Sequence, residues 1–346
     1  MPSKKIIRPE ISEAMPTTEK SSQRREHVSS VRLLLIIAVI FLNLVLLLPA
    51  SLSLQPLQQS ANPKILIRRG ESISYLAMRH YGFYHDSVLV LLQRTNPQIS
   101  DWQNLKTGET LVFPALAAAT LAYENLRSEA ALAVLTFFEG ETKYRRGTNG
   151  KFEPARVNLI LRPHDEIQTG KNSRAELVLD QRSVLRLDAN SRLRLVQLNR
   201  DRQKKQPYQG LFELMIGSAW AHLVKIIDRA PKVDLQFPTA IAGVQGTSYR
   251  AQVTADSATN VRVYSGTVAV RSKPAGPPRQ IGPPQRVPGP QQITLEAWIK
   301  LVAAQQEINI AKNGRPGEPQ PFADRGAEAA WVRWNQTRDR DLYAGR

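Results

Sequence analysis

The sequence contains no cysteine, which excludes disulfides, thiolate metal sites and a thiol nucleophile. Its five histidines do not fall at a zinc-binding spacing. A phosphate-binding loop, a Gly-x-Ser-x-Gly nucleophile motif and a dinucleotide fingerprint are also missing. These absences predict a protein that is not an enzyme, with no catalytic residues, no cofactor and no metal.

Two groups of acidic residues could instead be catalytic. His164-Asp165-Glu166 could be catalytic, but the segment is turn-like and precedes a strand, so we expect it to be exposed. Asp180 and Asp188 could form a pair for glycan cleavage. Aspartate is common in β-turns, and a structural role is the favoured interpretation of both groups.

Acidic residues are few relative to basic ones: 30 Asp and Glu face 47 Lys and Arg, giving a formal charge of +17. Such a charge attracts polyanions, whether nucleic acid, anionic lipid or acidic envelope polymers. The 346 residues are enough for two folded units with linkers.

Residues 33–50 form an uncharged apolar run, LLLIIAVIFLNLVLLLPA, which is long enough to cross most of a bilayer. We therefore predict a transmembrane helix at 33–54 and a cytoplasmic basic tail at 1–32, because Arg24, Arg25 and Arg32 lie close to the membrane. The remainder would lie in the periplasm of a bacterial inner-membrane protein, away from nucleic acid. A cleaved signal peptide, with Ser51 and Ser53 near the cleavage site, is the alternative, but the long polar leader favours a retained anchor.

Residues 63–115 carry the pattern of a small α+β module. Ser72 is a candidate N-cap, and the positions after it have the 3.6-residue spacing of an amphipathic helix. Asn96-Pro97 stops a second helix, because proline disfavours a helical residue before it. The predicted order is a strand at 64–67, a short helix after Ser72 that ends at Tyr81-Gly82, a second helix that begins near Asp86-Ser87, and a strand at 110–113.

This module resembles the LysM family in several spaced motifs: Gly70-Glu71-Ser72-Ile73, Leu76-Ala77, Tyr81-Gly82, Asn96-Pro97-Gln98-Ile99, Leu105-Lys106-Thr107-Gly108-Glu109 and Leu111-Val112-Phe113-Pro114. The family usually has Asp-Thr where this chain has Glu71-Ser72. The resemblance implies binding of peptidoglycan or another N-acetylglucosamine-containing glycan in a shallow groove between two loops. The implied carbohydrate-binding residues are Gly70, Glu71, Ser72, Ile73, Asn96, Pro97, Gln98 and Ile99.

We predict a helical linker at 116–131. The sequence pattern of residues 132–272 predicts an all-β domain. Short segments alternate apolar and polar residues between turn signals, which favours antiparallel hairpins. Alternation fits a sandwich and a coiled ladder equally well. The clearest predicted strands are 134–138, 175–179, 183–187, 192–195, 233–237 and 261–264.

This region resembles the FecR-like domain, above all in Phe138-Glu139-Gly140, Asp165-Glu166-Ile167-Gln168-Thr169-Gly170, Gly217-Ser218-Ala219 and Phe237-Pro238-Thr239-Ala240-Ile241-Ala242-Gly243-Val244-Gln245-Gly246-Thr247. Gln245 stands where the family usually has arginine. Founding members pass a signal to a cytoplasmic sigma factor through a cytoplasmic domain with tryptophans. Residues 1–32 contain no tryptophan, so the resemblance implies instead a domain that binds a ligand or an envelope partner.

Residues 273–346 combine a proline-rich connector with two predicted C-terminal helices. The first would begin near Thr294 and carry Leu295, Trp298, Ile299 and Val302, and the second would pack Trp331 and Trp334 in a core. The whole sequence thus predicts a multidomain, non-enzymatic peptidoglycan-binding envelope protein, a scaffold or a sensor. The alternative is a FecR-type transmembrane signal transducer that acts on a cytoplasmic regulator. The expected partners are the glycan, the lipid bilayer and an envelope protein.

Overall fold

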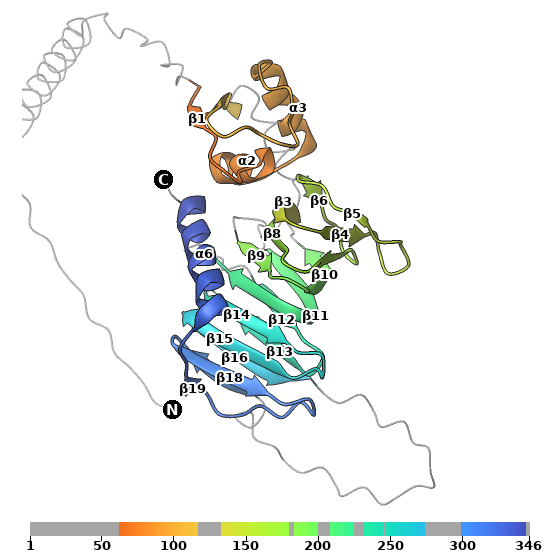
Figure 1. Cartoon of the computed structure of the whole chain (residues 1–346), viewed down its shortest axis with the longest axis vertical. Helices are drawn as coiled ribbons and strands as arrows, with labels where there is room; N and C mark the ends of the chain where they lie inside the picture. The colour runs from red at the N-terminus through yellow and green to blue at the C-terminus, as the bar shows by residue number, and fades with distance from the viewer. Residues whose placement is uncertain are drawn as a thin grey trace, which may run out of the picture. The chain divides into compact units, whose positions relative to one another are not determined.

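The computed structural model describes residues 62–116, 133–179, 183–199, 208–224, 232–244, 246–273 and 299–343, all within the compact unit Asn62–Arg346 (Figure 1). The predicted cytoplasmic tail, the transmembrane segment 33–54, the linker after Leu116 and the proline-rich connector lie outside the described residues. Within the described ranges, no helix combines the length and apolarity needed to cross a membrane.

The small module has the predicted βααβ order, and each element ends near the residue that the sequence indicated. Ser72 is extended and accepts a hydrogen bond from the Tyr75 N–H, and Gly82 ends the first helix with a left-handed φ of 79°. The two strands pair antiparallel. The elements are β1 (Lys64–Leu66), α2 (Ile73–Tyr81), α3 (Asp86–Thr95) and β2 (Thr110–Val112).

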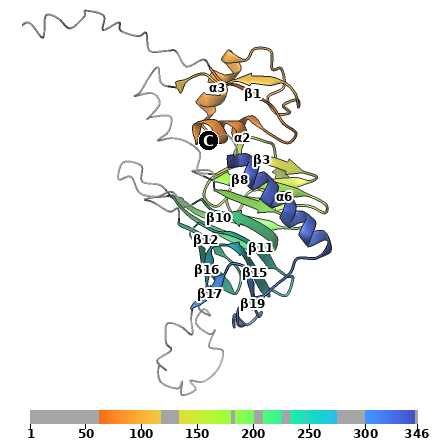
Figure 2. The same ribbon diagram turned by 90° about the vertical axis from the view of Figure 1, so that its left-hand side faces the viewer.

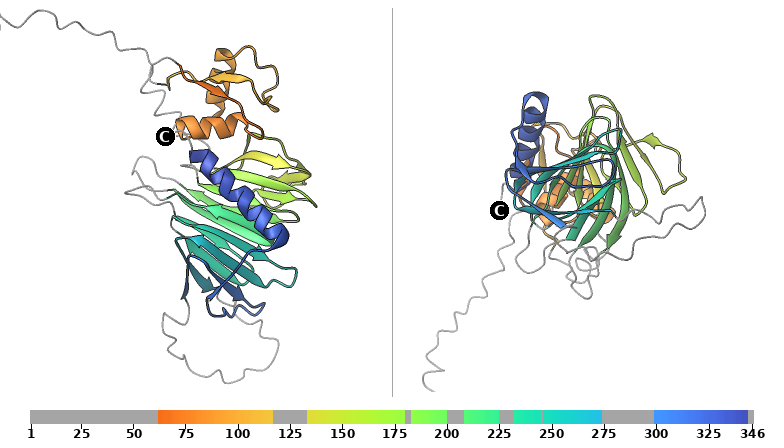
Figure 3. Two further views of the ribbon diagram at one scale, coloured as in Figure 1. Left: turned by 60° about the vertical axis from the view of Figure 1, so that its left-hand side comes forward. Right: turned by 90° about the horizontal axis from the view of Figure 1, so that it is seen from below.

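The β-domain is one sheet of 17 described strands that curls so that its two halves face each other across a shared apolar core (Figure 3). In what we call layer 1, neighbouring strands are β6 (Leu159–Ile160), β3 (Ala133–Glu139), β8 (Arg174–Leu179), β9 (Val184–Leu187), β11 (Gln209–His222), β14 (Ser248–Val253), β15 (Thr259–Ser265), β18 (Gln306–Ile310) and β19 (Gln320–Pro321). In layer 2 they are β5 (Glu153–Pro154), β4 (Thr142–Arg145), β7 (Glu166–Thr169), β10 (Arg192–Asn199), β11, β12 (Lys232–Gln236), β13 (Ala240–Val244), β16 (Thr267–Ser272) and β17 (Ile299–Ala303).

Strand β11 belongs to both layers, which makes the curled sheet continuous. Its first part pairs with β10 and β12, and its last part pairs with β9 and β14. Gly217 stands at the change of layer with a φ of 92°, and a Cβ there would lie 2.3 Å from the Ser191 Oγ. Only glycine tolerates both the left-handed φ and the close approach of Ser191. The glycine of the Gly217-Ser218-Ala219 motif is therefore required by the backbone. Of the two alternatives left open by the sequence, the coiled ladder is the better description.

All six predicted strands are present, and turns separate them. Asn172 and Asn190 adopt left-handed φ values of 54° and 53°, as short polar residues in tight turns can. Leu177, Leu185 and similar alternating residues fill the shared core. Several strands were not predicted, among them the 14-residue β11.

The C-terminal region differs from its prediction in one element. The helix expected from Thr294 through Val302 is wrong in its described part, because Ile299–Ala303 is strand β17. Val302 lies opposite Val268 of β16 and is fully buried, whereas Leu301 is 65% exposed. Four apolar residues in a short segment fit the period of a helix and that of a strand equally well. Pairing with β16 selects the strand. The second helix is present as α6 (Gly326–Tyr343).

Candidate functional site

The first predicted wall of the glycan groove is covered rather than open. Glu71, Ser72 and Ile73 are buried. The Glu71 carboxylate accepts hydrogen bonds from the Arg68 backbone N–H at 2.9 Å and from Arg79 at 2.7 Å. Gly70 has a φ of 79°, and a Cβ on it would lie 3.2 Å from the Phe137 ring of β3. This wall is therefore a rigid turn that contacts the β-domain.

The second predicted wall divides into buried and exposed positions. Asn96 is fully buried and uses its amide internally: it donates to the Leu92 and Val112 carbonyls and accepts from the Val112 N–H at 2.6 Å. It joins the end of α3 to β2. Ile99 is also buried, whereas Pro97 and Gln98 are exposed. Pro97 and Gln98 are the members of this wall that a ligand could reach directly.

Asn158, a residue that the sequence did not single out, connects the β-domain to both loops of the module. Its Oδ1 accepts from the Ser74 backbone N–H at 3.1 Å, and its Nδ2 donates to the Trp102 backbone carbonyl at 3.3 Å. Ser74 is in the first turn of α2, where backbone N–H groups lack partners within the helix. One carboxamide thus joins the first turn of α2 to the loop after α3.

The outward face of layer 1 carries a row of polar and aromatic side chains that lie opposite one another on successive strands. The row crosses β8, β9, β11, β14, β15 and β18 in register and consists of Glu176, Arg186, Trp220, Arg250, Arg262 and Glu307. Helix α6 lies across these strands (Figures 2 and 3). It contributes the complementary groups Glu328, Trp331, Trp334, Asn335, Arg338 and Asp339.

The buried centre of this row is a set of ion pairs. Glu176 receives hydrogen bonds from Arg186 at 2.8 Å and from Arg338 at 2.7 and 2.8 Å. Asp339 accepts from Arg186 at 2.5 Å and from the Trp220 indole N–H at 3.0 Å. Burial alone would raise the pKa of Glu176, but Arg338 and Arg186 hold that pKa well below its usual range. These ion pairs add to the apolar contacts of Trp331 and Val332 in holding α6 on layer 1.

Arg338 also joins this row to the small module. Its guanidinium lies 5.2 Å from the Tyr75 ring of α2 and 4.7 Å from the Phe137 ring of β3. Cations over aromatic faces are attracted by the ring quadrupole. Burial raises the pKa of Tyr75 above its ordinary value, so the phenol stays neutral beside these charges. The end of α6, strand β8 and α2 thus meet at one arginine.

Layer 2 has a second carboxylate cluster, which corrects one expectation. Asp165 and Glu166 were expected to be exposed, but both are buried because arginines surround them. Glu166 accepts hydrogen bonds from Arg145, Arg192 and Arg194 at 2.7 to 2.9 Å. Burial alone would raise its pKa, and the arginines instead lower the pKa of Glu166 to about 2. A carboxylate held in its charged form by three arginines suits structure better than acid–base catalysis.

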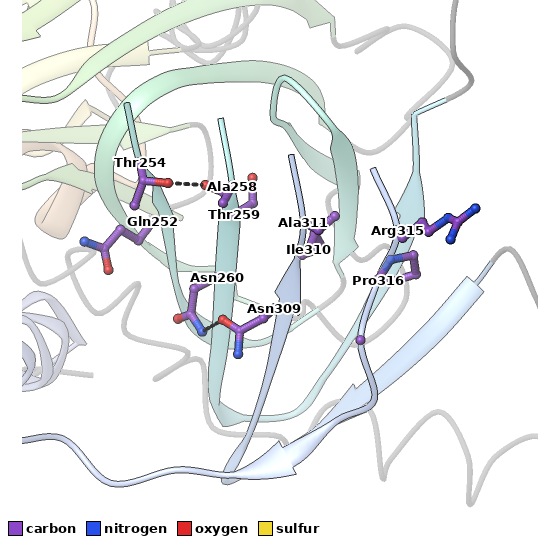
Figure 4. Close-up of a pocket in the computed structure, with 11 residues that line it drawn as sticks. Gln252, Thr254, Ala258, Thr259, Asn260, Asn309, Ile310, Ala311, Arg315 and Pro316 are labelled. Atoms are coloured by element: carbon purple, nitrogen blue, oxygen red, sulfur yellow. Dashed lines mark hydrogen bonds between the residues drawn. The ribbon is translucent and has the colours of Figure 1, made fainter. Parts of the chain in front are cut away.

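An open pocket of about 380 Å³ lies over the far end of layer 1 (Figure 4). The amides of Gln252, Asn260 and Asn309 follow one another across β14, β15 and β18. The Asn260 Nδ2 donates to the Asn309 Oδ1 at 2.8 Å, and Arg315 lies at the rim. Such a row can donate to and accept from a neutral polar ligand. The described residues contain no cluster of His, Asp and Glu suited to a metal.

Comparisons with known proteins bear on the β-domain. Residues 165–269 match the model of the family described as "FecR protein". The matched segment is similar to a FecR domain. It runs from β7 into β16 and includes Glu166 and most of the polar row of layer 1, whereas the small module and α6 lie outside it.

Two crystal structures, both described as a "putative anti-sigma factor" from Parabacteroides distasonis ATCC 8503, are similar to the chain at 17% and 16% identity, with TM-scores of 0.33 and 0.34. Each similarity covers 49% of this chain and 64% of that chain. The comparison with curated proteins finds no match.

Sequence reasoning missed Asn158 and Arg338. Asn158 acts on a residue 84 positions away, and Arg338 on a residue 162 positions away. The left-handed φ of 68° at Asn158 fits an asparagine in a turn, but a turn signal does not indicate a partner. No local pattern could have identified these contacts.

Proposed function

We propose that this chain is a non-enzymatic cell-envelope protein whose βααβ module binds an N-acetylated glycan of the peptidoglycan type. In this proposal the FecR domain responds to that binding, or to an envelope partner, as a scaffold or sensor. The acidic residues then have structural roles, since the buried Asp165 and Glu166 are both paired with arginines.

The observation that carries the proposal is the pair of backbone groups that hold the Asn158 carboxamide. The Ser74 N–H donates to the amide oxygen, and the Trp102 carbonyl accepts from the amide nitrogen. An N-acetyl group presents the same oxygen and N–H to a binding site. These two backbone groups belong to the helix and the loop that border the predicted groove, beside the half-buried Trp102 ring. The module therefore offers a backbone donor and a backbone acceptor to an amide, which supports the proposal.

Binding to insoluble glycans tests the proposal. The full chain in detergent should sediment with purified peptidoglycan and with chitin, but not with cellulose, which lacks acetamido groups. Gln98→Ala should weaken sedimentation several-fold, because Gln98 is an exposed member of the predicted groove, whereas Gln93→Ala, an exposed change on α3, should not. A wild-type chain that stays in the supernatant with peptidoglycan and chitin would refute the proposal.

The FecR domain itself favours a second candidate function, a transmembrane signal transducer. In that case residues 1–32 would contact a cytoplasmic regulator. A pull-down with a peptide of residues 1–32 separates the two candidates. Specific capture of one regulatory protein, lost when Arg24 and Arg25 are changed to Ser, supports transduction. Absence of capture would count against transduction.

A further inference from the structure

The β-domain covers the part of the module where the proposed function puts the glycan. Asn158 contacts the helix and the loop that border the groove, and Phe137 lies against Gly70 of the first wall. Arg338 approaches Gly70 and also lies over the Tyr75 ring. Three residues of the β-domain and α6 therefore occupy the space in front of the turn before α2.

Asn158 presents the module with a chemical copy of an acetamide. Its Cβ occupies the place of the acetyl methyl, its carbonyl oxygen accepts from Ser74, and its NH₂ donates toward Trp102. In an N-acetyl sugar the ring is attached through the amide nitrogen. A sugar bound in this orientation would therefore extend over the Trp102 side, away from the first turn of α2. The side chain and the sugar amide cannot use the same two backbone groups at once.

We propose that docking of the module on the FecR-containing β-domain and binding of an N-acetylated glycan exclude each other, with Asn158 as the internal competitor. This inference rests on the proposed function and deepens it: glycan binding releases the module from the β-domain and from the end of α6. The apparent affinity of the wild type is then reduced by the fraction of molecules that are docked. Arg338 contacts both Tyr75 of the module and Glu176 of β8, so release of the module changes the contacts of α6.

The central variant is Asn158→Gly in the full chain in detergent. Glycine keeps the left-handed φ of 68° without strain, so the change removes only the carboxamide. The matched control is Asn190→Gly, an exposed asparagine with a φ of 53° in a turn of the β-domain. The probe is the soluble tetramer of N-acetylglucosamine, measured by calorimetry. We expect Asn158→Gly to bind about tenfold more tightly than the wild type, and Asn190→Gly to bind as the wild type does.

A distance measurement tests the release directly. The chain has no cysteine, so paired spin labels can be attached at Gln93→Cys of α3 and Lys312→Cys of the β-domain, both exposed. A saturating tetramer should broaden the distance distribution of the wild type toward that of the ligand-free Asn158→Gly variant. Ligand binding that leaves the wild-type distances unchanged would overturn the competition.

The outcomes separate this inference from the function on which it rests. Equal affinity of wild type and Asn158→Gly overturns the competition and leaves glycan binding intact. Weaker binding by Asn158→Gly also overturns it, because Asn158 would then support the site. If neither chain binds the tetramer or sediments with peptidoglycan, the proposed function fails and the inference fails with it.

Discussion

Two glutamates ten residues apart, Glu166 and Glu176, occupy opposite layers of the sheet, and both carboxylates are shielded from solvent by arginines. The partners of Glu166 come from neighbouring strands of its own layer, and the side chains of Arg192 and Arg194 are 34% and 31% exposed. Glu176 pairs with Arg186, which is fully buried, and with Arg338 of α6, which is 12% exposed.

The comparison shows how the same ion-pair chemistry can serve two purposes. Around Glu166 the arginines can turn to water, so the cluster ties together strands that already pair. Around Glu176 the charges are almost fully buried, and Arg338 and Asp339 come from a helix distant in sequence. Breaking such a pair leaves an uncompensated buried charge. The Glu176 cluster is therefore expected to determine whether α6 stays on layer 1.

The largest expected effect comes from Glu176→Gln. Loss of the carboxylate leaves two buried arginines, Arg186 and Arg338, with Asp339 as the one remaining carboxylate of the cluster, so the free energy of unfolding should fall by about 3 to 5 kcal/mol. Urea unfolding followed by tryptophan fluorescence measures this, because Trp331 and Trp334 are on α6. Glu139→Gln, which removes an exposed partner of Arg174, is the control and should cost less than about 1 kcal/mol. Equal effects of the two changes would abolish the distinction between buried and exposed pairs.

Glu166→Gln should have a smaller effect, about 1 to 3 kcal/mol, although Glu166 has more arginine partners than Glu176. The reason is that Arg192 and Arg194 are about one-third exposed and can be rehydrated. The same urea titration gives the value. A loss larger than that of Glu176→Gln would reverse the comparison and make layer 2 the more tightly coupled face.

The two clusters also differ in how far the sequence could predict them. Local signals were sufficient for the Ser72 cap, for the turn at Asn190 and for the βααβ order, because each depends on residues a few positions apart. The alternation of Arg192 and Arg194 with Leu193 and Leu195 is typical of an outward face of a strand, but it does not reveal that both arginines bind Glu166. The row beneath α6 depends on strand register and on a helix far along the chain, which no periodicity encodes.

The candidate site shows the same division. The sequence located the two loops of the module by their Gly and Asn-Pro turns. Burial of Glu71 and Ile73, and the internal hydrogen bonds of Asn96, follow from how the module is packed and could not be predicted from the motif. The covering residue Asn158 lies in another domain. Whether a groove is open is therefore a property of the whole chain.

Lowering the pH should reduce the contribution of the Glu166 cluster to the free energy of unfolding. The folded-state pKa of Glu166 is about 2, compared with an ordinary value of 4.5, so its stabilising contribution is complete above pH 4.5 and is lost as the pH falls toward 2. The wild type should lose stability in that range, and Glu166→Gln should show a flatter dependence. The measurement is the urea midpoint at pH 5, 4 and 3. Parallel curves for the two chains would show that Glu166 is not the titrating group.

Salt should have the smallest effect and sharpen the comparison further. Raising NaCl from 0.05 to 0.5 M shortens the screening length and weakens exposed pairs more than buried ones. The loss caused by Glu166→Gln should therefore shrink in high salt, by several tenths of a kcal/mol, because its partly exposed arginines are screened. The loss caused by Glu176→Gln should stay constant, since Arg186 has no contact with solvent. A salt-dependent Glu176 effect would mean that α6 leaves layer 1 often enough to admit ions to this cluster.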